Sequence, residues 1–217
     1  MTLFPDRLLE GYKTFATTRL PSEQSRYREL SERGQSPEIM VIGCCDSRVS
    51  PEVIFDAGPG ELFVVRNVAN LVPPYAPDGQ AHGVSAALEF AVQVLRVKHI
   101  VVLGHAQCGG VRAAVEDNAP LSPGDFIGSW MSLLAPTVKE AARGADESLE
   151  AFVTRLEQRA ISTSLRNLMT FPCVSILVER GKLQLHGAYF GVARGSLSVL
   201  DRIGGAFHGI DAEAVTG

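Results

Sequence analysis

The chain has 217 residues, of which 46% are hydrophobic and 20% are charged, and its formal net charge is −4. This length and composition are typical of one globular domain with a substantial core. The mildly acidic balance offers no positive field for a phosphate backbone, and no stretch reaches the roughly 18 apolar residues of a membrane span. We therefore expect neither nucleic acid nor a membrane as a partner.

The first twenty residues lack the charged start, the continuous apolar core and the cleavage site of a signal peptide. We expect a cytoplasmic protein. Leu8, Leu9, Tyr12 and Phe15 instead recur at helical spacing, which predicts an amphipathic helix that docks on something.

Three short runs rich in Val and Ile follow, at 38–44, 61–67 and 99–105. They are nearly continuous rather than alternating, as is typical of strands that are covered on both faces. Between the second and third runs, residues 83–97 carry apolar side chains at helical spacing. A strand, a helix and a strand in this order indicate a right-handed parallel crossover.

Another helix is predicted from Cys108 onward, and a helical region from about 127 to 169. Residues 173–190 are interpreted as two strands that form a hairpin around Arg180 and Gly181. The expected fold class is α/β. It is a single domain in which helices flank a mostly parallel central sheet, with four parallel strands and an antiparallel edge strand.

Two polar motifs follow predicted parallel strands. The motif "CCDSR" follows the first run and "HAQC" follows the third. Ligands of such sheets bind beyond the carboxyl ends of the strands, so the two motifs would face each other if these strands are neighbours.

The metal-site rules interpret Cys44, His105 and Cys108 as a zinc site of two cysteines and one histidine. Cys108 would lie in the first turn of a helix, whose positive end favours a thiolate. The remaining candidates for a fourth ligand are Cys45, Cys173 and Asp46, and without one of them the site would be open for water or substrate.

Alternation along a strand turns Cys45 away from the side of Cys44 and places Asp46 on it. Arg48 can hold the Asp46 carboxylate in a charge-assisted pair, which makes Asp46 less available to a metal. Cys45 and Cys173 are interpreted as core residues.

The pattern Cys44-x-Asp46-x-Arg48 followed by His105-x-x-Cys108-Gly-Gly resembles the β-class carbonic anhydrases. The similarity runs from about residue 30 to 200 and includes the segments "PGELFVVRNVANLVPPY" and "GKLQLHGAYF". It implies one zinc ion per chain on the cysteines and the histidine. It also implies hydration of carbon dioxide to bicarbonate by a zinc-bound hydroxide that an Asp46–Arg48 pair orients.

The resemblance also implies an assembly and a substrate wall. The chain would be a homodimer or a dimer-based tetramer, in which residues 1–30 form a helical arm over the partner subunit. Gln35, Phe63 and Val68 match residues that line the family's active site, partly from the partner. Phe90 stands where a tyrosine is common in the family.

A further implication concerns regulation. Some β-class enzymes carry a second bicarbonate pocket that resembles a trio of tryptophan, arginine and tyrosine. By position this chain supplies Val41, Arg66 and Phe90, so we predict no such switch.

Three alternatives stay open on the sequence. The first is a carbon disulfide hydrolase on the same fold. The second is a non-catalytic zinc protein or a bicarbonate-responsive protein. The third is a redox or nucleophilic enzyme that uses Cys44 or Cys45.

Overall fold

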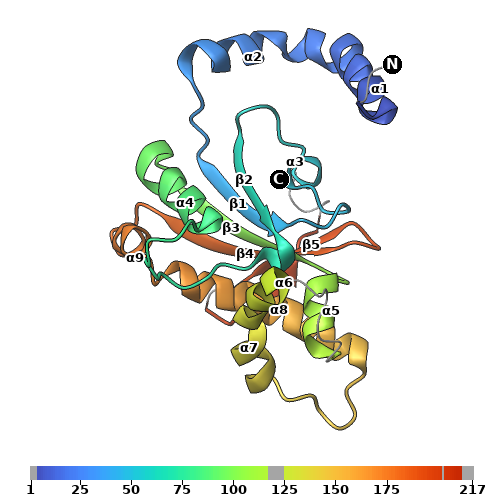
Figure 1. Ribbon diagram of the computed structural model, residues 1–217, viewed down its shortest axis with the longest axis vertical. Coiled ribbons are helices and arrows are strands. Elements are labelled where there is room, and N and C mark those ends of the chain that lie inside the picture. The colour runs from blue at the N-terminus through green and yellow to red at the C-terminus, as the bar shows by residue number, and fades with distance from the viewer. Residues whose placement is uncertain (1–3, 117–124, 202, 212–217) are drawn as a thin grey trace.

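The structure is a computed structural model that describes residues 4–116, 125–201 and 203–211 (Figure 1). These residues form one sheet with the strand order β2-β1-β3-β4-β5-β6. Its strands are β1 (Ile39–Cys44), β2 (Leu62–Asn67), β3 (His99–His105), β4 (Gln184–Gly191), β5 (Ser196–Leu200) and β6 (Phe207–Gly209). The strands β2, β1, β3 and β4 are parallel, and β5 and β6 extend the sheet antiparallel. The predicted α/β class is confirmed, with two antiparallel strands at the edge in place of one.

Helices make up most of the remaining described chain. They are α1 (Asp6–Thr14), η1 (Phe15–Arg19), α2 (Leu20–Arg33), α3 (Pro51–Ile54), η2 (Val68–Asn70), α4 (Gly83–Glu89), η3 (Phe90–Leu95), α5 (Gly109–Val115), α6 (Asp125–Met131), η4 (Ser132–Leu134), α7 (Ala135–Glu140), α8 (Leu149–Leu168) and α9 (Pro172–Glu179). The helical region expected at 127–169 is interrupted between α7 and α8, where the Ser148 hydroxyl accepts the amide of Ala151 and so caps α8.

The prediction of a hairpin around Arg180 and Gly181 is wrong. Its first half is the helix α9, and β4 then pairs parallel with β3. Pro172 suits the first turn of a helix, where its missing N–H has no intrahelical partner. Val174, Leu177 and Val178 recur at helical spacing and pack against the core. A short apolar run alone does not distinguish a buried strand from a buried helix.

The two faces of the sheet are covered differently. On one face Met40, Ile42 and Ile100 pack against α4, η3, α8 and α9. On the other face lie Val41, Leu103 and Ala188, and among the described helices only α3 adds a side chain there. The apolar neighbours of these three residues, such as Val64 and Leu197, are only half-buried. This second face is therefore apolar but incompletely covered.

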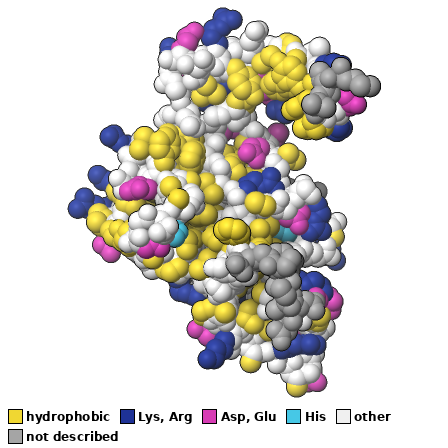
Figure 2. All heavy atoms as spheres, in the orientation of Figure 1, with side chains coloured by type: hydrophobic (Ala, Val, Ile, Leu, Met, Phe, Trp, Pro, Cys, Tyr) yellow, Lys and Arg dark blue, Asp and Glu magenta, His cyan; other side chains and the backbone are white. Residues whose placement is uncertain are grey.

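The elements α1, η1 and α2 form an arm that extends away from the sheet (Figure 1). None of the described residues in these three elements is buried. Hydrophobic side chains gather on the arm (Figure 2), including Leu8, which is 55% exposed, and Tyr12, which is 65% exposed. The predicted amphipathic helix is thus present, although residues 1–3 of the expected arm lie outside the described residues.

In the ranges that the structure describes, no single helix is both long and apolar enough to cross a membrane. The bent pair of α8 and α9 has the length and composition of a membrane span, but this is the only feature of a span that it has.

Candidate metal centre

The first and third predicted strands are neighbours, so their carboxyl ends meet at one edge of the sheet. Cys44 is the last residue of β1, and His105 is the last residue of β3. Cys108 is the N-cap of α5, three residues after His105. Between them, Gln107 has a left-handed backbone with a φ of 58°, which turns the chain sharply. At Gly110 a Cβ would lie 3.0 Å from Cγ1 of Val68 and 3.3 Å from Cβ of Ala69, so a larger residue would have to displace these neighbours and glycine suits the close approach of α5.

Cys44, His105 and Cys108 form a buried cluster whose ligand atoms lie within 4.8 Å of one another. Nδ1 of His105 lies 2.9 Å from the carbonyl oxygen of Ala106, to which it donates. The other nitrogen, Nε2, therefore presents a lone pair, and it is buried without a hydrogen-bond partner in the described structure. Two thiols and an imidazole nitrogen are the donors that zinc prefers, so these residues fit the ion.

The cluster favours ionisation of one of its two sulfur atoms, that of Cys44. The pKa of Cys44 is lowered to about 4, chiefly because the thiol of Cys108 donates to its thiolate, and the backbone N–H groups of Asp46 and Ala69 donate to it as well. The pKa of Cys108 is raised, because it shares its proton with Cys44 and is buried beside that charge. A coordinated metal ionises such thiols outright.

Asp46 and Arg48 form a bidentate ion pair directly beside this cluster. Arg48 donates from Nε to Oδ1 of Asp46 at 2.9 Å and from Nη2 to Oδ2 at 2.7 Å. The backbone N–H of Arg48 donates to Oδ1 as well, at 3.0 Å. These bonds, chiefly those from the guanidinium, hold the pKa of Asp46 well below its usual range. Asp46 is therefore a carboxylate at every working pH.

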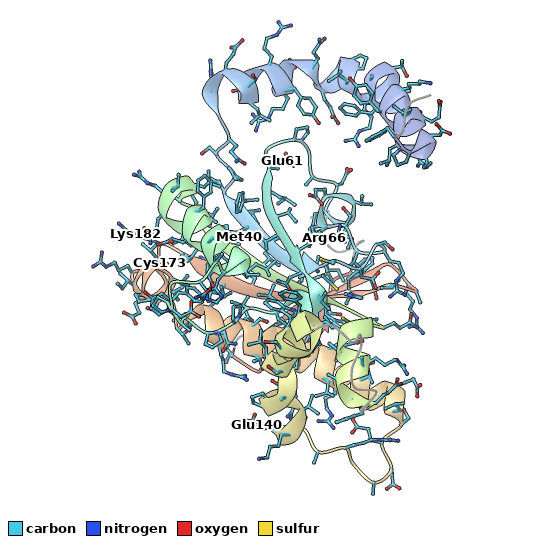
Figure 3. All side chains as sticks on the ribbon, in the orientation of Figure 1. Met40, Glu61, Arg66, Glu140, Cys173 and Lys182 are labelled. Carbon is cyan, nitrogen blue, oxygen red and sulfur yellow. The ribbon has the colours of Figure 1, made fainter. Side chains whose placement is uncertain are left out.

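The sequence reasoning missed the contacts that fix the loop after β1. Arg66, labelled in Figure 3, donates to the carbonyl oxygens of Cys44 at 2.8 Å and Asp46 at 2.6 Å. Arg48 also donates to the carbonyl oxygen of Gln107 at 3.1 Å. The sequence did contain a signal for the contacts of Arg66, because an arginine in an otherwise apolar parallel strand needs polar partners.

It also missed Glu157, whose side chain is buried in α8. Its Oε1 accepts the amide of Cys108 at 2.8 Å, and its Oε2 accepts the hydroxyl of Tyr189 at 2.7 Å. Burial raises the pKa of Glu157. A glutamate among the buried residues Phe152, Val153, Leu156, Ala160 and Ile161 of one helix was the available signal.

Of the four predicted wall residues, only Val68 lies beside the cluster in the same chain. It is half-buried and lines a cavity of about 570 Å³ together with Cys45 and Trp130. Phe63 pairs with Met40, four residues before Cys44, which places it about 13 Å away along the strand. The rings of Phe63 and Phe90 lie 5.9 Å apart. Gln35 is exposed between α2 and β1.

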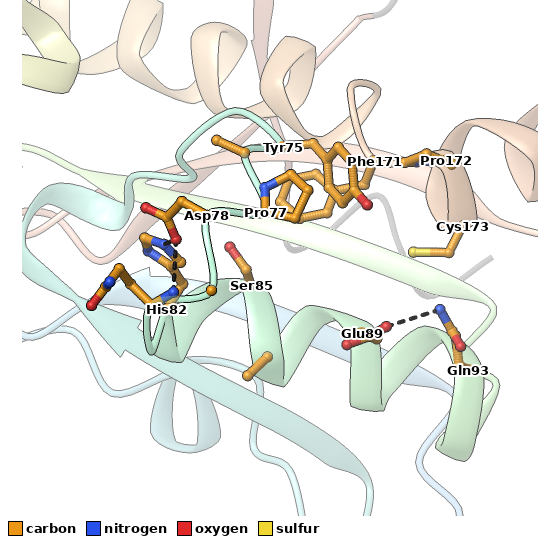
Figure 4. A pocket seen from close by; sticks show the side chains of 14 residues that line it. Tyr75, Pro77, Asp78, His82, Ser85, Glu89, Gln93, Phe171, Pro172 and Cys173 are labelled. Atoms are coloured by element: carbon orange, nitrogen blue, oxygen red, sulfur yellow. Dashed lines mark hydrogen bonds and ion pairs between the residues drawn. The ribbon is translucent and has the colours of Figure 1, made fainter.

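Of the two predictions of core cysteines, that of Cys45 is wrong, whereas Cys173 is half-buried and packs against the core. Cys45 is exposed, because the chain leaves the sheet at this residue and its side chain faces the cavity beside Val68. Cys173 is half-buried in the first turn of α9 and lines a separate cavity of about 420 Å³. In Figure 4 that cavity also shows the pairs Asp78–His82 and Glu89–Gln93.

The structure does not bring together the trio Val41, Arg66 and Phe90. Val41 belongs to the incompletely covered face of the sheet, where its partly buried neighbours include Phe190. Phe90 contacts Phe63, which packs against the core on the opposite face. Because side chains alternate along a strand, Val41 and the contact of Phe90 with Phe63 lie on opposite faces of the sheet. Matching positions in the sequence does not reveal this separation.

A family model described as carbonic anhydrase matches residues 39–197. Beta carbonic anhydrase 3 of Arabidopsis thaliana is 37% identical over 89% of this chain and 76% of its own length. A carbonic anhydrase of Pseudomonas aeruginosa is also 37% identical, over 89% of this chain and 86% of its own.

Solved structures agree with these relatives. The β-carbonic anhydrase CcaA is similar with a TM-score of 0.84 and 30% identity, covering 95% of this chain and 92% of that one. The Coccomyxa β-carbonic anhydrase, in complex with acetazolamide, is similar with a TM-score of 0.79 and 30% identity, covering 92% and 87%. The chain belongs to the carbonic anhydrase family, and its fold is that of the β-carbonic anhydrase structures. Within it, the chain belongs to the β class and is a carbonic anhydrase enzyme.

Proposed function

We propose that the chain is a zinc enzyme that hydrates carbon dioxide reversibly to bicarbonate, with Asp46 and Arg48 as its catalytic pair. The proposal is carried by one observation, namely that an ionised carboxylate with three hydrogen bonds lies beside a buried cluster of two thiols and an unpartnered imidazole nitrogen. Cys44, His105 and Cys108 would hold the zinc. Bound there, zinc supplies a Lewis acid that lowers the pKa of a water molecule, an effect for which carbonic anhydrase is itself the standard example.

The role of Asp46 follows from its hydrogen bonds. Its Oδ1 accepts two N–H groups of Arg48, whereas Oδ2 accepts only one. Oδ2 can therefore accept the hydrogen of a nucleophilic oxygen and direct the lone pair of that oxygen at carbon dioxide. Arg48 keeps the carboxylate ionised and fixed, so that Asp46 does not itself move onto the metal.

The substrate wall requires a second copy of the chain. Val68 is the one predicted wall residue beside the cluster, and Phe63, Phe90 and Gln35 lie elsewhere in the same chain. We propose a homodimer in which the partner supplies these three residues. The exposed apolar arm and the incompletely covered face of the sheet support this assembly. So does the similarity to tetrameric β-carbonic anhydrases of Sordaria macrospora, with a TM-score of 0.75 and 28% identity over 95% of this chain and 98% of that one.

Metal analysis together with stopped-flow hydration of carbon dioxide tests the activity. We expect about one zinc per chain and rapid turnover. A pure protein without zinc, or a zinc protein that does not accelerate hydration, would contradict the proposal.

Light scattering tests the assembly. A variant with both Leu8→Asp and Tyr12→Asp should be monomeric and inactive, because it places charge on the apolar face of the arm. Thr18→Asp places one negative charge at another exposed position of the arm and serves as the control. An active monomer would refute the shared wall.

A further inference from the structure

The peptide bond between Gln107 and Cys108 is held at both of its ends by charged side chains. Its carbonyl oxygen accepts from Nη2 of Arg48 at 3.1 Å. Its N–H donates to Oε1 of Glu157 at 2.8 Å. A peptide unit is a dipole with the oxygen negative and the hydrogen positive, so the cation and the anion lie at the ends that suit them. The orientation of this plane is therefore fixed from two sides.

This peptide requires such a restraint. Gln107 adopts a left-handed backbone, which is unfavourable for a residue with a side chain unless the surroundings impose it. Cys108 is the N-cap of α5, so its own N–H is not bonded within the helix. If the peptide plane rotated, the Cys108 sulfur would move relative to Cys44 and His105. The hydrogen bond from Arg48 would break with it.

Glu157 itself is rigidly held. Its side chain is only 3% exposed, and its second oxygen accepts the hydroxyl of Tyr189 on β4 at 2.7 Å. A buried carboxylate is costly unless its oxygens are hydrogen-bonded, and here both are. The contacts thus form a continuous path from Asp46 through Arg48 and the peptide to Glu157 and Tyr189.

We propose that Glu157 is a positioning residue of this enzyme. By fixing the Gln107–Cys108 peptide against Arg48, it holds the Cys108 ligand and the Asp46–Arg48 pair in register with each other. Glu157 does not touch the substrate and acts through the backbone of Cys108. The inference rests on the zinc site of the proposed function.

The test measures zinc affinity by competition with a chromogenic chelator, which needs no turnover. Glu157→Ala should weaken zinc binding about ten- to hundredfold, the usual effect of removing a group that orients a ligand. Glu157→Gln keeps a carbonyl oxygen for the Cys108 amide and should recover most of that loss. In the cobalt-substituted proteins, the thiolate-to-cobalt absorption should shift in the alanine variant and return toward the parent's in the glutamine variant.

Thr137→Val is the matched control for lost stability. It removes a partly buried hydrogen bond between α7 and α8, which joins the hydroxyls of Thr137 and Thr163 at 2.9 Å, without touching the peptide. It should lower the melting temperature and leave zinc affinity and the cobalt spectrum unchanged. If Glu157→Ala does not fold, Tyr189→Phe releases one anchor of Glu157 and should still alter the cobalt spectrum.

Two results would overturn the inference. One is an alanine variant with the parent's zinc affinity and cobalt spectrum. The other is a glutamine variant as weak as the alanine variant, which would make the charge of Glu157 the cause rather than the hydrogen bond. A parent protein that itself binds no zinc would instead overturn the proposed function, so the two failures are distinguishable.

Discussion

Asp46→Asn changes one atom of the proposed catalytic pair and tests its role most directly. The amide oxygen can take the place of Oδ1 and keep both N–H donors of Arg48. The amide nitrogen then replaces Oδ2, 2.7 Å from Nη2 of Arg48, so that two donors face each other. The variant loses one charge-assisted hydrogen bond and the anionic acceptor of the proposed mechanism.

The expected loss of stability is modest. A hydrogen bond to a charged group contributes about 1.5–3 kcal/mol. The Arg48 side chain is 44% exposed and that of Asp46 is 19% exposed, so solvent screens the pair. We expect a decrease of about 1–2 kcal/mol in the free energy of unfolding, measured by urea denaturation. The zinc content should not change, because Asp46 is not among the proposed zinc ligands.

The expected loss of activity is much larger. Proton-handling groups contribute about 10²–10⁴-fold, so stopped-flow hydration should slow by at least about a hundredfold. The low pKa of Asp46 keeps it ionised above the ordinary carboxyl pKa of about 3.9. The stabilisation by the ion pair is thus present at neutral and alkaline pH and is lost only as pH falls below that range. The rate of the variant should accordingly be depressed by the same factor from pH 6 to 9.

Asp78→Asn is the matched control. The Asp78 carboxylate is also hydrogen-bonded, with Oδ1 2.7 Å from Nε2 of His82, but it lies outside the metal centre. It should keep the parent's hydration rate. If Asp46→Asn turned over like Asp78→Asn, the pair of Asp46 and Arg48 would be structural only and the mechanism would be refuted.

Three further predictions concern the metal, the strand that carries His105 and regulation. Cys44→Ser and Cys108→Ser should each lose zinc in metal analysis, and undiminished zinc in both would remove them as ligands. At Gly104 a Cβ would lie 2.6 Å from Cδ1 of Ile161, so Gly104→Ala should destabilise the fold by about 1–3 kcal/mol in urea. Combining it with Ile161→Ala should cost less than the sum of the two changes, and strict additivity would argue against this contact. Bicarbonate should inhibit hyperbolically, since Arg66 already donates to two backbone carbonyls, and a sigmoidal curve would contradict this.

The sequence by itself determined three of the four parallel strands, the edge of the sheet where the site lies, and the three metal-binding candidates. These follow from local rules, because apolar continuity marks a strand covered on both faces and a strand end places its next residues at one edge. The ion pair of Asp46 and Arg48 could be predicted by a local rule as well, because side chains two positions apart in a short loop are within reach of each other.

Only the tertiary structure decided which distant groups meet. Glu157 is 49 residues from Cys108, and its contact depends on how α8 packs beneath α5. Phe90 and Val41 were grouped by position, yet the sheet lies between them. The run at 172–179 is a helix, because Pro172 suits the first turn of a helix and one face of this helix packs against the core. Sequence spacing carries information over a few residues, whereas packing in three dimensions sets contacts between residues of any separation.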